Sequence, residues 1–200
     1  MKTLLGLVLS CLLVADAVRA AEPVLGLPCE GCELVFAGMP AEPGSRARIA
    51  PVDAKGEPMT IEGTVRTRDG VAAAGIVVYA YQTDAHGSYP RGNTRHGLLR
   101  GWVRTDAQGR YRFDTVRPGA YPMRSDPQHV HLHVVEPGRG TYYIDDLVFD
   151  DDPRLTAAQR ERQSGRGGYG ITHPVRDADG VWQVRRDIAL GAGILAYPAD

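Results

Sequence analysis

The sequence predicts an all-β fold, a mostly antiparallel β-sandwich with long loops and one short helix. Short segments rich in β-branched and aromatic residues follow one another along the chain, and turns containing Gly, Pro or Asp separate them. Only one segment has a helical pattern. Two hundred residues are enough for a single domain of this kind with a sizeable core.

The individual elements follow from local patterns. The first strand alternates polar and apolar residues, the second is apolar on both faces, and Asp-Gly or Gly-containing turns precede several of the others. We expect strands at residues 60–66, 75–82, 101–105, 110–113, 129–135, 142–149 and 181–188. Residues 155–163 are the expected helix. The glycine-rich stretch 164–170 lacks the strand–loop–helix setting of a phosphate site, so we expect a plain loop there.

The N-terminus has the features of an export signal. Lys2 provides a positive charge, residues 4–15 are apolar, and Val18-Arg19-Ala20 places small residues where a signal peptidase cleaves. We therefore expect residues 1–20 to be removed after Ala20 and the protein to be periplasmic or secreted. The apolar run is too short to span a membrane, so no transmembrane segment is expected. Cys11 leaves lipoprotein processing open as an alternative.

Two cysteines lie in the segment that follows, residues 21–58. Cys29 and Cys32 flank Glu-Gly, and in an oxidising compartment such a pair forms a small structural disulfide. A catalytic thiol is the alternative. Residues 59–200 would then form the β-sandwich domain. The net charge of −1 and the scattered arginines give no argument for nucleic-acid binding.

Four residues could bind one metal ion. His131 and His133 alternate with apolar residues in a predicted strand, so both imidazoles project from the same face. Tyr89 and Tyr121 each lie between Gly and Pro in a predicted loop. Phenolates are hard anionic oxygens that favour an oxidised metal such as Fe(III). These residue types therefore indicate a ferric site.

The order of these residues resembles the intradiol ring-cleavage dioxygenases, in particular those of the protocatechuate 3,4-dioxygenase type. The likeness runs from about residue 61 to residue 153. It rests on four stretches, namely Tyr79-Ala-Tyr-Gln-Thr-Asp-Ala-His-Gly-Ser-Tyr89, residues 104–122 ending in Pro-Gly-Ala-Tyr-Pro, His131-Leu-His133, and Asp145-Asp-Leu-Val-Phe-Asp-Asp-Asp-Pro153.

The resemblance implies one non-haem Fe(III) per chain, with a catecholic small molecule and O2 as substrates. The ring would be cleaved between its two hydroxylated carbons to give a muconate-type product. Tyr89, His131 and His133 would remain bound to the metal, while Tyr121 would leave it and accept a proton. Tyr81 corresponds to an aromatic position in the family's substrate pocket, although a tyrosine there could equally belong to the core. Neither the particular catechol nor the oligomeric state follows, and a homo-oligomer is compatible with the sequence.

The chain departs from the family at one place that matters. The enzymes that it resembles have an arginine shortly before the first histidine ligand, where Gln128 stands here, and His129 occupies a position that is commonly proline. Arg124, which follows the Tyr-Pro pair, could replace that arginine in part. Gln128, Arg124 and Tyr121 are therefore the candidate catalytic residues, and His129 joins Tyr81 as a pocket candidate.

Other hypotheses remain open at this stage. A three-histidine zinc site is disfavoured because residues four apart on a strand are separated by about 13 Å, so His129 and His133 cannot readily share an ion. A zinc hydrolase with two histidines and a carboxylate, Asp84 or Asp126, is one alternative. A non-catalytic secreted β-sandwich module is the other, because such modules share the strand and turn patterns.

Overall fold

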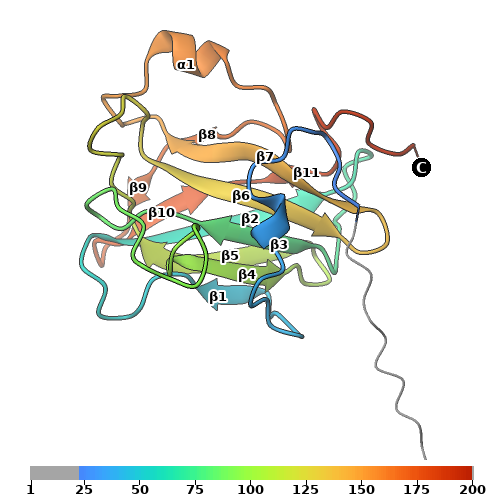
Figure 1. Cartoon of the computed structure of the whole chain (residues 1–200), viewed down its shortest axis with the longest axis horizontal. Coiled ribbons are helices and arrows are strands. Elements are labelled where there is room, and N and C mark those ends of the chain that lie inside the picture. Colours follow the sequence, from blue (N-terminus) through green and yellow to red (C-terminus); the bar gives the residue numbers. More distant parts are fainter. Residues whose placement is uncertain (1–22, 200) are drawn as a thin grey trace, which may run out of the picture.

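The computed structural model describes residues 23–199, and the predicted signal peptide lies outside them. Two sheets pack face to face as a sandwich (Figure 1), which confirms the predicted fold class. Both sheets are mixed, because parallel pairs accompany the antiparallel ones. None of the helices in the described part is long and apolar enough to cross a membrane.

One sheet has six strands in the order β1-β5-β2-β10-β9, with β11 also paired to β2. Its strands are β1 (Arg46–Arg48), β2 (Pro58–Arg66), β5 (Arg110–Val116), β9 (Val175–Arg176), β10 (Trp182–Arg185) and β11 (Ile188–Ala189). The longest pairing is antiparallel, between β2 and β5. β1 belongs to the predicted N-terminal segment, and it pairs with β5 in parallel.

The other sheet has five strands in the order β4-β3-β6-β7-β8. These are β3 (Val77–Tyr81), β4 (Arg100–Arg104), β6 (His129–Glu136), β7 (Gly140–Phe149) and β8 (Ile171–Thr172). The single α-helix, α1 (Ala157–Glu161), lies outside the sandwich and begins with a capping box in which Thr156 and Gln159 bond each other's backbone amides (Figure 1).

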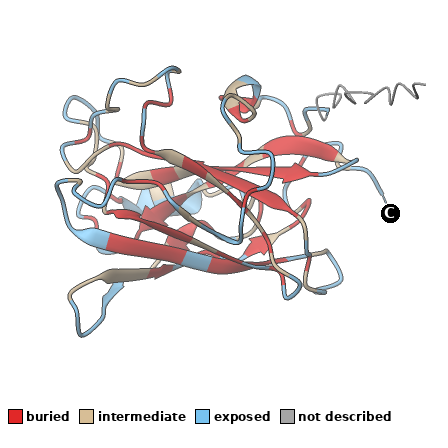
Figure 2. Cartoon of the chain, turned by 90° about the horizontal axis from the view of Figure 1, so that it is seen from below, coloured by how far each residue is buried: buried red, intermediate tan, exposed pale blue. Residues whose placement is uncertain are grey.

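The core lies between the sheets, where most residues of β2, β3, β5, β6 and β7 are buried (Figure 2). Along β6 the inward residues are Val130, Leu132 and Val134, all with no exposed surface. The three histidines of the same strand therefore point to the opposite, outer face of the five-stranded sheet. That outer face carries the functional candidates.

An N-terminal strap, residues 24–39, covers part of this outer face and includes the 3-10 helix η1 (Cys32–Leu34). Val35 packs in a small cluster with Tyr79 and Tyr81 of β3, and its carbonyl accepts a hydrogen bond from the indole of Trp102 at 2.6 Å. The structure joins Cys29 and Cys32 in a disulfide with Cα atoms 5.7 Å apart. The strap is thus packed onto the sheet beside the histidines.

The strands and the helix expected from the sequence are all present, with differences at their ends. The segment expected as one strand at 181–188 forms two short strands, β10 and β11, separated by Arg186 and Asp187. β1, β8 and β9 were not expected. Each has two or three residues, too few for a periodic pattern. β1 and β8 also depend on partners that are distant in sequence, whereas β9 pairs with the nearby β10.

Candidate metal centre

Three of the four predicted ligands converge at one point. The hydroxyl oxygens of Tyr89 and Tyr121 are 2.6 Å apart, and Nε2 of His131 lies 3.0 Å from the first and 3.3 Å from the second. Tyr89 and Tyr121 come from separate loops and His131 from β6. Two phenol oxygens and one imidazole nitrogen therefore face a common centre.

Close backbone contact between the two loops brings the tyrosines together. A Cβ atom on Gly87 would lie 2.1 Å from the carbonyl oxygen of Ala120, and one on Gly119 would lie 2.4 Å from the amide nitrogen of Gly87. Both glycines therefore permit an approach that no side chain would allow. Asp84 reinforces the contact, because its carbonyl accepts the amide of Gly119 at 2.7 Å.

A β-bulge in β7 supplies the partner of His131. In the register between β6 and β7, Val130 faces Leu147 and Leu132 faces Ile144, so two residues, Asp145 and Asp146, stand opposite His131 alone. The extra residue turns Asp146 toward the outer face, where its carboxylate accepts a hydrogen bond from Nδ1 of His131 at 2.9 Å.

This contact fixes how His131 can act. With Nδ1 donating to Asp146, the lone pair of Nε2 points at the two phenol oxygens, as in the carboxylate–histidine pairs of many metal sites. Burial alone would lower the pKa of His131, but the charge and hydrogen bond of Asp146 outweigh it and raise that pKa.

His129 occupies the next position around the centre. Its ring centroid is 4.6 Å from that of His131 and 5.1 Å from that of Tyr121. Nδ1 donates to the carbonyl of Pro127 at 2.7 Å, which leaves the lone pair on Nε2. Burial lowers the pKa of His129 and so keeps the ring neutral. A ligand atom of each of His129, His131 and Asp146 lies within 4.8 Å of the other two.

His133 does not join this cluster. It has no exposed surface, and its Nε2 donates to the carbonyl of Glu30 in the strap at 2.7 Å. It packs among Tyr79, Tyr81 and Tyr143 rather than against the two loop tyrosines. Burial lowers its pKa to about 4. The structure therefore brings together His129 and His131, where the sequence predicted His131 and His133.

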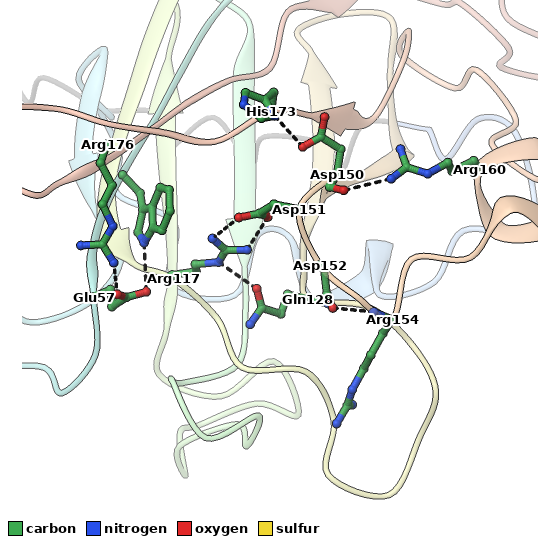
Figure 3. A network of polar contacts seen from close by, with 11 residues as sticks. Glu57, Arg117, Gln128, Asp150, Asp151, Asp152, Arg154, Arg160, His173 and Arg176 are labelled. Carbon is green, nitrogen blue, oxygen red and sulfur yellow. Dashed lines mark hydrogen bonds and ion pairs between the residues drawn. The ribbon is translucent and has the colours of Figure 1, made fainter.

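Gln128 is also directed away from the cluster. Its side-chain oxygen accepts a hydrogen bond from Arg117 at 2.8 Å, in a polar network shown in Figure 3. Arg117 in turn forms a bidentate ion pair with Asp151, with N–O distances of 2.6 and 2.8 Å. The side chain of Gln128 therefore anchors the start of β6, and the geometry gives it no contact with the metal candidates.

The same network holds the loop that carries Tyr121. Asp152 accepts the backbone amides of Gln128 and Arg154, the latter at 2.8 Å. Nη1 of Arg154 donates to the carbonyls of Tyr121 and Arg124 at 2.9 and 3.2 Å. Figure 3 shows Gln128, Asp152 and Arg154 close together. Asp152, in the acidic segment that follows β7, thus helps to tie the loop that carries Tyr121 to the sheet.

A cavity of about 490 Å³ opens over the cluster, and we call it the main cavity. Tyr81 is buried in its wall and stacks between His131 and His96, with ring centroids 4.4 and 3.7 Å away. Arg124 lies at the wall with its guanidinium 5.3 Å from the centre of the Tyr121 ring, and it forms an ion pair with Asp126 at 2.6 Å. Tyr81, Arg124 and His129, three of the predicted pocket or catalytic residues, thus line this space.

The donor set suits an oxidised transition metal. Burial raises the pKa of Tyr89, and the hydrogen bond with Tyr121 raises it further; burial also raises the pKa of Tyr121. Without a metal both phenols are therefore protonated, and a bound cation would have to displace those protons. Two imidazole nitrogens and two phenol oxygens are borderline and hard donors, which fits Fe(III).

The two carboxylates considered for a zinc hydrolase are engaged by other groups. Asp84 caps its own turn by accepting the amides of His86 and Ser88 at 2.9 and 3.0 Å. Asp126 pairs with Arg124. The carboxylate beside the histidines is Asp146, which the sequence analysis missed. It could have been found from the spacing of the inward residues of β7, because Ile144 and Leu147 are three apart where a regular strand would place them two apart.

The fold is a β-sandwich, and its outer face carries a tyrosine–histidine cluster whose donors suit an oxidised metal. A family model described as "Dioxygenase" matches residues 40–164. The chain belongs to the intradiol ring-cleavage dioxygenase family. The catechol 1,2-dioxygenase 1 of Acinetobacter lwoffii is 36% identical over 153 residues, which cover 72% of this chain and 49% of that protein.

Other relatives agree with this assignment. The β chain of protocatechuate 3,4-dioxygenase from Burkholderia cepacia is 31% identical over 112 residues, 50% of this chain and 48% of that one. The chain spans about half the length of these curated relatives.

Solved structures are similar in fold. The dioxygenase domain of a dioxygenase–carbohydrate-binding fusion protein from Streptomyces sp. SirexAA-E has a TM-score of 0.59 at 25% identity and covers 76% of this chain and 90% of that one. Catechol 1,2-dioxygenase from Acinetobacter sp. ADP1 has a TM-score of 0.61 at 20% identity, covering 82% and 63%.

Proposed function

We propose that this protein is a non-haem Fe(III) dioxygenase that cleaves a catecholic ring between its two hydroxylated carbons, with O2 as co-substrate and a muconate-type acid as product. Tyr89, Tyr121, His129 and His131 would hold one ferric ion. This set replaces His133 of the sequence prediction by His129, because His133 is engaged by the strap.

One observation carries the proposal. Nε2 of His131 faces both tyrosine hydroxyls at 3.0 and 3.3 Å, while Nδ1 is held by the partly buried carboxylate of Asp146 on the other side of the ring. A plain structural sandwich has no need of such an arrangement, and a zinc hydrolase would leave the convergence of two phenols without a purpose. The relatives named catechol 1,2-dioxygenase 1 and protocatechuate 3,4-dioxygenase β chain support the same type of reaction.

When bound, the ferric ion would supply Lewis acidity that favours the deprotonated forms of phenols and catechols. The residues of the chain would do the rest. Asp146 keeps the proton on Nδ1 of His131, and the Pro127 carbonyl does the same for His129, so both rings present a lone pair. Tyr121 lies at the cavity edge, is half-buried and has Arg124 over its ring, so it is placed to accept a proton from an entering catechol. Tyr81 forms a flat wall against which an aromatic ring can stack.

Metal analysis with a visible spectrum tests the proposal. Protein expressed in iron-replete medium should contain about one iron per chain and show a broad visible band from the tyrosines, and should consume O2 when catechol is added. Tyr121→Phe should keep part of its iron, shift the band and lose nearly all O2 uptake. Tyr169→Phe is the matched control, because Tyr169 is exposed and outside the cavity. Stoichiometric zinc without a visible band would refute the proposal and favour a hydrolase. Iron without O2 uptake on any catechol would favour a non-catalytic role.

We also propose that the protein is exported, by virtue of the predicted signal at residues 1–20 and the cysteine pair that follows it. Intact mass measurement of protein recovered from the periplasm or medium should show an N-terminus at Ala21. Recovery of the unprocessed chain from the cytoplasm alone would contradict this.

A further inference from the structure

A second hollow adjoins the main cavity, and we call it the basic hollow. It has a volume of about 520 Å³. Its lining residues are Arg124, Ser125, Pro153, Arg154, Thr156, Gln159 and Arg162. Arg124, Gln159 and Arg162 also line the main cavity, so the two spaces meet at these side chains. The loop that carries Tyr121 forms one side of the basic hollow through Arg124 and Ser125. The segment from Pro153 to Arg162, which includes α1, forms the other side.

The two spaces differ in charge. The lining of the main cavity includes four acidic residues, Glu30, Asp126, Asp145 and Asp146, and three arginines, Arg95, Arg124 and Arg162, of which the last two stand where it meets the basic hollow. Among the described residues that line the basic hollow there are three arginines and no acidic residue. An anionic group would therefore be favoured in the basic hollow and disfavoured deeper in the main cavity.

Two of these arginines keep their positive charge available. Nη1 of Arg154 donates only to the backbone carbonyls of Tyr121 and Arg124, so in the described part of the chain no carboxylate neutralises this guanidinium. The side chain of Arg162 has neither a hydrogen bond nor an ion pair with any described residue, and it is exposed. Arg124 differs, because Asp126 offsets its charge. Arg154 and Arg162 are therefore the cations that an oxyanion would find.

The size of the main cavity points in the same direction. A space of about 490 Å³ is in the range of pockets that hold drug-sized ligands, so a single catechol ring against Tyr81 would leave much of it unfilled. Val148 and Leu155, the latter just before α1, add an apolar surface to the lining of the main cavity. The lining thus combines an aromatic ring, apolar side chains and, where the two spaces meet, arginines, which are the groups that would contact an aromatic ring, a carbon spacer and an acid.

We propose that the substrate is a catechol whose carboxylate is carried on a spacer of two or more carbons, with the carboxylate bound in the basic hollow by Arg154 and Arg162. This inference rests on the proposed function, and it specifies the substrate class of that site. A carboxylate attached directly to the ring would remain in the main cavity among its acidic residues, so it would gain less.

The test compares ligands on the iron-loaded protein through the shift of the visible band. The ligands are catechol, 3,4-dihydroxybenzoate, 3-(3,4-dihydroxyphenyl)propionate and the uncharged amide of the last. The propionate should bind about tenfold more tightly than its amide at low salt, since two partly exposed ion pairs each contribute about three- to five-fold. High salt should reduce this ratio. The benzoate should bind more weakly than the propionate.

Two variants test whether Arg162 itself, rather than the total positive charge of the protein, favours the acid over the amide. Arg162→Gln should lower the ratio of acid to amide affinity about three- to five-fold. Arg48→Gln removes an exposed arginine on β1 that lines neither space, and it should keep the ratio of the unmodified protein. Because the amide serves as an internal reference, a general loss of affinity would not imitate the expected result.

The other outcomes are distinguishable. If catechol shifts the band but the propionate and its amide bind equally, or the benzoate gains as much as the propionate, this inference is wrong while the proposed function stands. An unchanged ratio in Arg162→Gln would equally overturn the role of the basic hollow. If catechol itself produces no shift, the proposed function fails and the inference fails with it.

Discussion

Replacing His129 and His133 one at a time should separate metal binding from stability. His129→Ala removes a half-buried ring whose free nitrogen belongs to the metal cluster. The loss of partners that merely orient a ligand costs roughly 10- to 100-fold in metal affinity, so loss of a ligand itself should exceed about 100-fold. His129→Ala should therefore be isolated with little iron and no visible band, while the unfolding free energy of the metal-free protein changes little.

His133→Ala should show the opposite pattern. The ring has no exposed surface, and its removal leaves both a void and an unpaired Glu30 carbonyl. Together these should lower the unfolding free energy by about 2–4 kcal/mol. Iron content should stay near one per chain. His133→Gln, which retains an N–H donor, provides a milder variant if the alanine protein folds poorly.

The assay is iron content beside denaturant unfolding of the metal-free protein, for both variants and the unmodified chain. Retention of one iron and a normal band in His129→Ala, together with their loss in a folded His133 variant, would show that the ligand pair is His131 and His133 after all. The reasoning from the strap and the bulge would then be refuted.

Three further predictions concern the surroundings of the cluster. Asp146→Asn should weaken iron affinity roughly 10- to 100-fold without abolishing it, as measured by competition with a chelator, because the carboxylate only orients His131; unchanged affinity would deny it that role. Burial lowers the pKa of His96 to about 4, below its usual 6.5, so the unfolded chain binds the proton more readily: the stabilisation is complete above pH 6.5 and is lost as the pH falls toward 4. In His96→Gln the loss of unfolding free energy between pH 6.5 and pH 4 should be smaller by at most about 3 kcal/mol. An unchanged pH dependence would contradict the lowered pKa of His96. Reduction of Cys29–Cys32 should cost no more than about 2 kcal/mol of stability and leave iron content intact, because the closed loop is short and supplies no ligand; release of iron on reduction would prove otherwise.

Local sequence patterns were sufficient for most of the fold. The alternation in β6 placed Val130, Leu132 and Val134 in the core, and the structure has them there. The same alternation placed His131 and His133 on one outer face, and in the structure His129 lies on that face as well. It could not decide which two histidines would share an ion, because His129 and His131 are as far apart along the strand as His131 and His133.

That choice is made by parts of the chain that are distant in sequence. The strap reaches His133 with the Glu30 carbonyl, 103 residues away, and occupies it. The bulge in β7 turns Asp146 toward His131 and fixes which of its nitrogens faces the tyrosines. Gln128 illustrates the same limit, because its role depends on Arg117 and on the acidic run after β7, and neither can be inferred from its neighbours.

The contact between Gly87 and Gly119 has a consequence for motion at the site. Where two backbones touch without side chains between them, neither loop can shift alone, so the two tyrosines share one rigid support. Any exchange of Tyr121 between bound and released positions would then have to occur by rotation about its own side-chain bonds. Such rotations take picoseconds to nanoseconds at exposed positions, whereas loop movements take nanoseconds to microseconds. The pair of glycines would thus make proton acceptance by Tyr121 a local swing of one ring, with the rest of the cluster held still.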